Sequence, residues 1–180
     1  MLEIIIPAVE QYDEVKEEFF TSKEQVLQLE HSLVSLSKWE SKWCKPFLIK
    51  GEKTAEETID YVRCMTITQN VNPDIYKFIT QDNIHEISAY IDAPMTATTF
   101  SKNNKNTISR EIITAEIIYY WMIALNVPFE CQKWHLNRLL TLINVCSIKN
   151  QPTKKMSKKE LLSRNRALNE SRKLALNSPG

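Results

Sequence analysis

Glycine is almost absent from this chain. Only Gly51 and Gly180 occur among its 180 residues. Phosphate-binding loops and nucleophile elbows need glycine, because their backbones adopt positive φ angles or approach a ligand closely. The sequence contains no G-x-G-x-x-G, G-x-x-x-x-G-K-S/T or G-x-S-x-G motif. It therefore disfavours nucleotide-dependent enzymes and α/β hydrolases, and it favours a helical fold over a β-sandwich rich in tight turns.

A nine-residue run without charged side chains, Ile117–Leu125, lies in the longest apolar region of the sequence. As a helix with a rise of about 1.5 Å per residue it is too short to cross a bilayer, so we expect no membrane-spanning segment. A helix that is apolar on every side in a soluble protein lies at the centre of the core. We therefore predict that Ile117–Leu125 is the central helix, that the chain turns at Pro128, and that Trp134–Ile143 packs back against it.

Short β-branched segments near the N-terminus predict a minor β part. Leu2–Ile6 is stopped by Pro7 and is predicted to be a strand. Glu18–Thr21 and Gln25–Glu30 are predicted to form a small hairpin or sheet with it. Thr96–Asn106 is polar and is predicted to be an exposed loop. The fold class that we expect is mainly α, with a minor α+β character from this N-terminal hairpin.

Capping signals and apolar spacing predict the helices. Ser32, Thr54 and Asn83 have the residue type of N-caps, and Thr54 and Asn83 are each followed three residues later by glutamate. Pro73 suits the first turn of a short helix. The strongest helical pair is expected at 109–126 and 129–148, and a last helix is expected after Ser157.

Charge is divided unevenly between the body of the chain and its end. Residues 1–148 hold 14 basic and 20 acidic side chains, whereas the remaining residues hold nine basic and two acidic ones. We therefore predict a helical core domain at 1–150, followed by a linker and a basic helical tail at 151–180. A basic tail on an acidic body indicates either a segment that binds a partner or one that is simply solvated. If it binds a partner, the residues that we expect to do so are Lys158, Lys159, Arg164, Arg166, Leu168, Arg172 and Lys173.

The cysteines form no C-x-x-C pair. Cys44, Cys64, Cys131 and Cys146 each lie among aromatic or aliphatic residues. That pattern is typical of reduced, buried thiols in a cytosolic protein. The N-terminal sequence also lacks the basic region and long apolar run of a signal peptide.

Cys131 and His135 lie four residues apart on a predicted helix, so both could point at one metal ion or form a reactive pair. Further ligands with complementary spacing are lacking, and a nucleophilic pair would need an orienting partner and an oxyanion turn. We therefore predict no catalytic residues, no cofactor and no metal. Glu116 lies in the apolar run, so we expect it to form an ion pair or to lie at the edge of the protein.

Aromatic residues and the basic tail each allow a second interpretation. Trp39, Trp43, Trp121 and Trp134, with Tyr119 and Tyr120, could line a ligand cage, but their helical spacing favours core packing. The tail could bind nucleic acid through phosphates. It has no aromatic side chains to stack on bases, and the acidic body would repel the phosphate backbone, so we regard nucleic-acid binding as the weaker alternative.

Three segments together resemble a known family. They are SLSKWESKWCKPF (Ser35–Phe47), SREIITAEIIYYWMIALNVPFECQKWHLNRLLTLINVC (Ser109–Cys146) and MSKKELLSRNRALNESRKLALN (Met156–Asn177). They are similar to small proteins of long-tailed bacteriophages that are encoded near the tape-measure gene and regarded as tail assembly chaperones. The terminal R-x-L-N-E-x-R-K pattern, which starts at Arg166, is similar to the ends of many such proteins.

This resemblance implies a non-enzymatic protein of the bacterial host cytoplasm that is absent from the mature virion. Family members coat the helical, apolar-striped tape-measure protein and keep it soluble until tail-tube subunits polymerise around it. Many also self-associate, so a homo-oligomer is expected. Two alternatives stay open at this point: a virion structural protein, such as a head–tail completion or tail subunit, and a small nucleic-acid-binding regulator.

Overall fold

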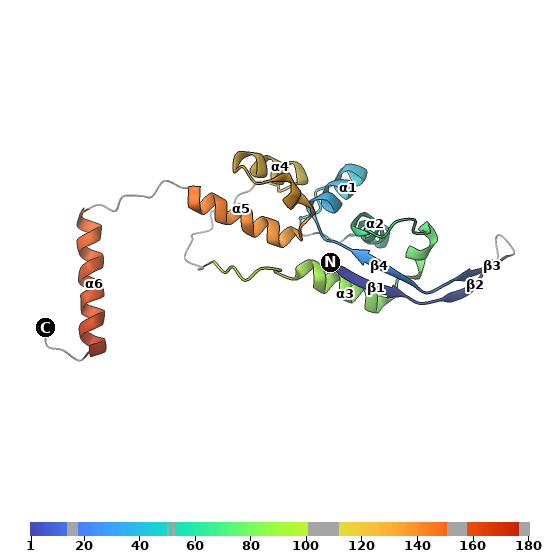
Figure 1. The fold of residues 1–180 in the computed structure, drawn as a ribbon, viewed down its shortest axis with the longest axis horizontal. Coiled ribbons are helices and arrows are strands. Elements are labelled where there is room, and N and C mark those ends of the chain that lie inside the picture. The colour runs from blue at the N-terminus through green and yellow to red at the C-terminus, as the bar shows by residue number, and fades with distance from the viewer. Residues whose placement is uncertain (14–17, 50, 52, 101–111, 151–157, 177–180) are drawn as a thin grey trace. The chain divides into compact units, whose positions relative to one another are not determined.

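The computed structural model describes residues 1–13, 18–49, 51, 53–100, 112–150 and 158–176 (Figure 1). Contacts divide the chain into two units, Met1–Ser147 and Ile148–Gly180. The first unit is called the body below. The fold is mainly helical with small antiparallel strand pairs near the N-terminus, which confirms the expected class.

The strands form two antiparallel pairs. β1 (Leu2–Ile6) pairs with β4 (Gln25–Leu29), and β2 (Val9–Asp13) pairs with β3 (Glu18–Ser22). The predicted strand at Leu2–Ile6 and its pairing with β4 are confirmed. The strand expected at Glu18–Thr21 exists, but it pairs with β2 and not with β1, because the chain forms a second, unpredicted pair beyond Pro7. Figure 1 shows β2 and β3 continuing the ribbon that β1 and β4 begin.

Predicted caps start the first helices. α1 (Leu33–Trp43) begins after Ser32 and α2 (Ala55–Met65) after Thr54, each through a capping box. In each box the cap side chain accepts from the backbone N–H three residues later, and the side chain of that residue accepts from the backbone N–H of the cap. A 3-10 helix, η1 (Pro73–Phe78), begins at the predicted proline.

The start of α3 (Gln81–Asp92) differs from the prediction. Its N-cap is Thr80, and Asn83 is the third helical residue. The Asn83 side chain accepts a hydrogen bond from the Thr80 backbone N–H at 3.2 Å. Asparagine therefore takes the place that glutamate usually has in a capping box, and the helix starts three residues earlier than the glutamate pattern predicts.

The predicted long helical pair is wrong in its bounds. α4 covers Ala115–Ala124, and 112–114 are not helical, while 109–111 lie outside the described residues. The second member is divided into a 3-10 helix, η2 (Phe129–Lys133), and α5 (Leu136–Asn150). The division has a physical cause: the Leu136 N–H donates to the His31 carbonyl at 2.7 Å, and a β-bridge joins Ser32 to His135. The chain is thus extended where a continuous helix was expected.

A buried carboxylate fixes the first turn of α4. Glu40, on α1, accepts hydrogen bonds from the backbone N–H groups of Ala115 and Phe47, each at 2.7 Å. Thr114, the N-cap residue, makes no side-chain cap hydrogen bond. Glu40 therefore caps α4 from another helix, and its negative charge lies where the helix dipole favours it.

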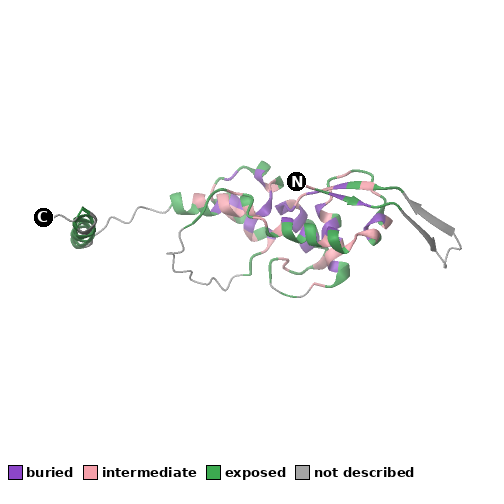
Figure 2. Cartoon of the chain, turned by 90° about the horizontal axis from the view of Figure 1, so that it is seen from below, coloured by how far each residue is buried: buried purple, intermediate pink, exposed green. Residues whose placement is uncertain are grey.

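Two clusters of buried side chains form the core of the body. Figure 2 colours the buried residues of the body purple along its helices and strands. The sheet-side cluster joins β1 and β4 to α2 and α3, with Trp39 of α1 among its members. The helix-side cluster joins α1, α4, η2 and α5 through residues such as Leu36, Ile118 and Leu139. α1 contributes to both clusters, so it is the element that connects them.

Several residues other than glycine adopt the left-handed conformation. Within the described residues these are Cys44, Asn70, Met95 and Asn126. Asn126 follows α4 in a Schellman arrangement, in which the Val127 N–H donates to the Met122 carbonyl at 2.8 Å. Val127 and Met122 are both buried in the helix-side cluster. This glycine-poor chain therefore ends α1 and α4 at some cost in backbone strain.

The second unit contains α6 (Lys158–Leu176). The predicted helix is present, while its predicted cap at Ser157 and the linker lie outside the described residues. The domain boundaries at 150 and 151 stay a prediction. Among the described residues, no helix combines the length and the apolarity that crossing a bilayer requires.

Candidate functional site

The pair with potential chemistry, Cys131 and His135, does not share a helix. Cys131 is buried in η2, and His135 follows the end of that element. His135 Nε2 lies 3.0 Å from the Tyr90 carbonyl oxygen, and Nδ1 accepts from the Asn137 N–H at 3.3 Å. Both ring nitrogens of His135 thus contact backbone groups of the body, those of Tyr90 and Asn137. Among the described residues no group of three potential ligands gathers around a common point.

A second histidine lies against the first. The ring centroids of His31 and His135 are 5.2 Å apart, and His31 Nδ1 lies 2.6 Å from the Tyr61 hydroxyl oxygen. Burial, and then the neighbouring His135, lowers the pKa of His31 to about 4. Burial also lowers the pKa of His135. Both rings are therefore neutral at neutral pH and act as hydrogen-bonding links in the core.

Buried carboxylates are found on α1 and α2, whereas Glu116 is exposed in the first turn of α4. Lys45 holds the pKa of Glu57 below its usual value, chiefly through a side-chain hydrogen bond. Burial pushes the pKa of Asp60 upward, but hydrogen bonds from Lys42 and Trp43 outweigh it and leave that pKa lowered. Glu57 and Asp60 thus belong to structural ion pairs. Glu116 was expected either to form an ion pair or to lie at the edge of the protein, and its exposure agrees with the second of these.

The aromatic residues belong to two places and do not form one cage. Trp39, which is buried, packs edge-on against Phe47, with ring centroids 5.0 Å apart, and Phe47 stacks on Tyr61. Trp121 and Trp134 pack against the helix-side cluster. Core packing is thus correct for the tryptophans, but it is wrong for Tyr120, whose side chain is exposed.

Cysteine environments also differ from the prediction in part. Cys131 is buried, Cys64 and Cys146 are half-buried, and Cys44 is exposed. Burial raises the pKa of the Cys64 thiol, which disfavours the reactive thiolate. Cys44 ends α1 in the left-handed conformation and belongs to neither cluster.

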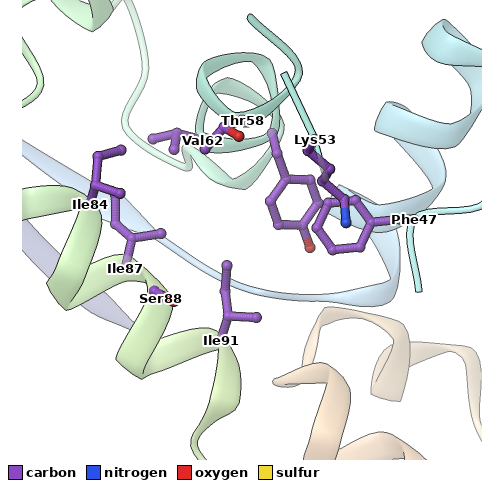
Figure 3. Close-up of a pocket in the computed structure, with 9 residues that line it drawn as sticks. Phe47, Lys53, Thr58, Val62, Ile84, Ile87, Ser88 and Ile91 are labelled. Atoms are coloured by element: carbon purple, nitrogen blue, oxygen red, sulfur yellow. The ribbon is translucent and has the colours of Figure 1, made fainter. Parts of the chain in front are cut away.

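An apolar groove lies between α2 and α3 (Figure 3). Its volume is about 180 Å³. Ile84, Ile87 and Ile91 reach it from α3, and Thr58 and Val62 face them from α2. The full lining, called the α2–α3 groove below, is Phe47, Lys53, Thr58, Tyr61, Val62, Ile84, Ile87, Ser88 and Ile91.

The α2–α3 groove has the size and lining to accept an apolar side chain of a partner, and Lys53 lies where it could contact a polar side chain next to it. Apolar cavities of about 150 Å³ accept a benzene-sized group. Lys53 lies at the rim, with its Nζ 4.3 Å from the centroid of the Phe47 ring. Apolar residues at every third or fourth position predicted the face of α3, but only the packing of α2 opposite that face makes it a groove.

The prediction that Ile117–Leu125 is a central helix is wrong, because one side of α4 is exposed. Ala115, Ile118 and Met122 are buried, whereas Tyr120 is 66% exposed and Ile123 is 61% exposed. Glu116 lies on the same side, because positions 116, 120 and 123 are four and three residues apart. Phe129 of η2 is also exposed, and its ring contacts that of Tyr119. These exposed residues, Glu116, Tyr120, Ile123 and Phe129, are called the α4 face below.

The predicted partner-binding residues all lie on α6. Arg166 forms an i,i+4 ion pair with Glu170, at 3.6 Å between Nε and Oε1. Leu161 and Leu168 are exposed and lie seven residues apart, on one side of the helix. For Lys158 the structure gives the backbone position only. The other predicted residues of this set, Lys159, Arg164, Arg166, Leu168, Arg172 and Lys173, are exposed.

Comparisons of the chain with protein-family models, with curated proteins and with solved structures gave no match.

Proposed function

We propose that this protein is a non-enzymatic tail assembly chaperone of a long-tailed bacteriophage. It acts in the cytoplasm of the bacterial host, binds the tape-measure protein, and is absent from the finished virion. The sequence segments quoted above motivate the family. The α2–α3 groove is the one structural observation that carries the proposal, because it offers an open apolar surface on a folded body.

The groove would bind amphipathic helices of the tape-measure protein. Helix-in-groove recognition uses apolar anchors at every third or fourth position of the bound helix. One anchor enters between Ile87 and Val62, while Lys53 meets a polar or acidic side chain beside it. Because the groove requires only an apolar stripe, many positions along one long tape-measure helix can bind a copy of the chaperone. Coating a tape measure requires such repeated binding.

The basic helix α6 extends this proposal to tail assembly. It carries six basic and two acidic side chains in 158–176. Exposed cations on a helix bind acidic segments with little demand on shape. We expect α6 to bind an acidic segment of the tail-tube protein or a neighbouring copy of the chaperone.

Co-expression with the tape-measure protein tests the proposal. The expected result is a larger soluble fraction of the tape measure and a complex that co-purifies with the chaperone. Unchanged solubility together with the lack of a complex would exclude the chaperone function.

Mass spectrometry separates this function from the structural alternative. A chaperone is abundant in the lysate of infected cells and missing from purified particles. Detection in particles at a fixed ratio to the tail-tube protein would instead indicate a virion structural protein.

The cations of α6 also give the nucleic-acid alternative a specific test. Such a regulator would bind duplex DNA with an affinity that falls steeply as salt is added. Binding that survives neutralisation of Arg166, Arg172 and Lys173 would place any nucleic-acid site elsewhere.

A further inference from the structure

The α4 face is an apolar surface without a covering element among the described residues. Tyr120 and Ile123 stand on the outside of a helix whose opposite side is wholly buried. α4 contains no lysine or arginine, and its only charged residue is Glu116. A second carboxylate, Glu130, follows Phe129 directly and is exposed. The surface is therefore apolar with an acidic edge, which favours an apolar partner that carries positive charge.

α6 has the opposite character. Its 19 residues include leucines and arginines on one side, since 161, 164, 168 and 172 follow the three-and-four spacing of a helical face. Leu161 and Leu168 are exposed there, as is Arg172. A lone helix of this length gains most of its stability in proteins from packing an apolar face. α6 is therefore a basic, leucine-bearing helix that is suited to an acidic, apolar surface.

The net charges of the two units also favour binding of α6 to the body of another copy, over longer distances than direct contacts. Residues 1–147 contain 14 basic and 20 acidic side chains, and residues 148–180 contain nine basic and two acidic ones. The resulting charges of about −6 and +7 attract each other, and attraction of this kind raises association rates at low salt.

We propose that α6 of one copy of this protein binds the α4 face of a second copy. Leu161 and Leu168 pack on Tyr120 and Ile123, and arginines of α6 approach Glu116. The choice of a second copy rests on the proposed function, which needs copies of the chaperone arranged along a rod. Each copy offers one α6 and one α4 face, so the contact is head-to-tail and builds closed rings or open filaments.

Light scattering on full-length variants tests this contact. Wild type is expected to form assemblies larger than a dimer, whose mass falls on dilution and at high salt. Ile123→Glu disables the α4 face, and Leu168→Glu disables α6, so each variant alone is expected to be monomeric. An equimolar mixture of the two is expected to form a heterodimer, because it restores one contact and then stops.

Matched controls separate the contact from general effects of a new charge. Ile67→Glu places glutamate at another isoleucine of the body that is 51% exposed. Leu162→Glu does the same on a different side of α6. Both controls are expected to assemble like wild type. Circular dichroism of all variants checks folding, and Tyr120→Ser replaces Ile123→Glu if that variant does not fold.

Two results would overturn the inference. One is a wild-type protein that is monomeric at every concentration, as it would be if α6 bound its own body or nothing. The other is a wild-type oligomer whose two variants stay monomeric when mixed, which indicates a symmetric or unrelated interface. Failure of the proposed function has a different signature, because the assemblies then form as expected while the tape-measure protein stays insoluble.

Discussion

The two core clusters of the body meet the surface in different ways. α3, over the sheet-side cluster, turns acidic and polar residues outward and leaves the narrow α2–α3 groove open. α4, over the helix-side cluster, has no polar face to turn outward and exposes Tyr120 and Ile123. A helix that is apolar all round is therefore not always central. When neighbouring elements cover only one side of it, the other side is available as an interface.

The clusters are also held by different means. Ion pairs between exposed lysines and buried carboxylates, Lys42 with Asp60 and Lys45 with Glu57, join α1 and the residues just after it to α2 on the sheet side. On the helix side, one carboxylate, that of Glu40, joins α1 to the start of α4. The helix side should therefore respond most strongly to a single substitution.

Removal of Glu40 is expected to have the largest effect. Glu40→Ala leaves the Ala115 and Phe47 N–H groups without their acceptor. Since buried groups that lose a charged partner are costly, we expect a loss of about 3 kcal/mol in the free energy of unfolding, measured by urea denaturation. Glu116→Ala, in the first turn of the same helix, is the control and should cost under about 1 kcal/mol. Similar losses in both variants would show that Glu40 does not hold α4 in the proposed way.

Acidification is expected to lower the free energy of unfolding nearly as much as Glu40→Ala does. The pKa of His31 is about 4 in the folded protein and 6.5 for an ordinary histidine. Between these values the unfolded chain takes up a proton that the folded protein refuses, so stability falls as pH drops from 6.5 toward 4. The full loss is about 3 kcal/mol.

Unfolding experiments at pH 7.5 and 5 measure this effect. The lowered pKa values of Glu57 and Asp60 act at lower pH, below the ordinary range of carboxylates. His31→Gln is expected to reduce the pH dependence between 5 and 6.5. An unchanged slope in that variant would assign the proton uptake to another group, with His135 the first candidate.

A smaller gain is expected at the end of α1. Cys44 closes this helix with φ of 51°, a conformation that costs an L-residue about 1 kcal/mol or more. Cys44→Gly relieves that strain and is expected to raise the melting temperature modestly, by the equivalent of about 0.5 kcal/mol after the added flexibility of the unfolded chain. Asn126→Gly should gain less, because asparagine tolerates the left-handed region. Destabilisation by Cys44→Gly would show that the thiol makes a contact worth more than the strain.

Local signals in the sequence predicted most of the elements. The caps at Ser32 and Thr54, the start at Pro73 and the strand at Leu2–Ile6 depend on neighbouring residues and were correct. Errors arose where distant residues decide. The start of α4 depends on Glu40, which lies 75 residues away, and the break before α5 depends on the backbone of His31.

The candidate surfaces were only partly predictable for the same reason. The three-and-four spacing of Ile84, Ile87 and Ile91 is typical of one helical face, but a groove exists only because α2 packs opposite them. The apolar run that contains Tyr120 and Ile123 was evident, yet which side remains open depends on the positions of α1 and α5. The basic residues of α6 were evident from charge alone, since a solvated helix needs no tertiary contact.

The most direct test of the account compares two single substitutions on α3 in co-expression with the tape-measure protein. Ile84→Glu puts a charge into the α2–α3 groove, and Ala89→Glu puts the same charge on the exposed side of the helix. The measurement is the soluble fraction of the tape-measure protein, with both variants checked for wild-type folding. We predict that Ala89→Glu keeps the tape measure as soluble as wild type does, while Ile84→Glu loses most of that effect. Equal solubility with both folded variants would contradict the claim that the groove binds the tape-measure protein.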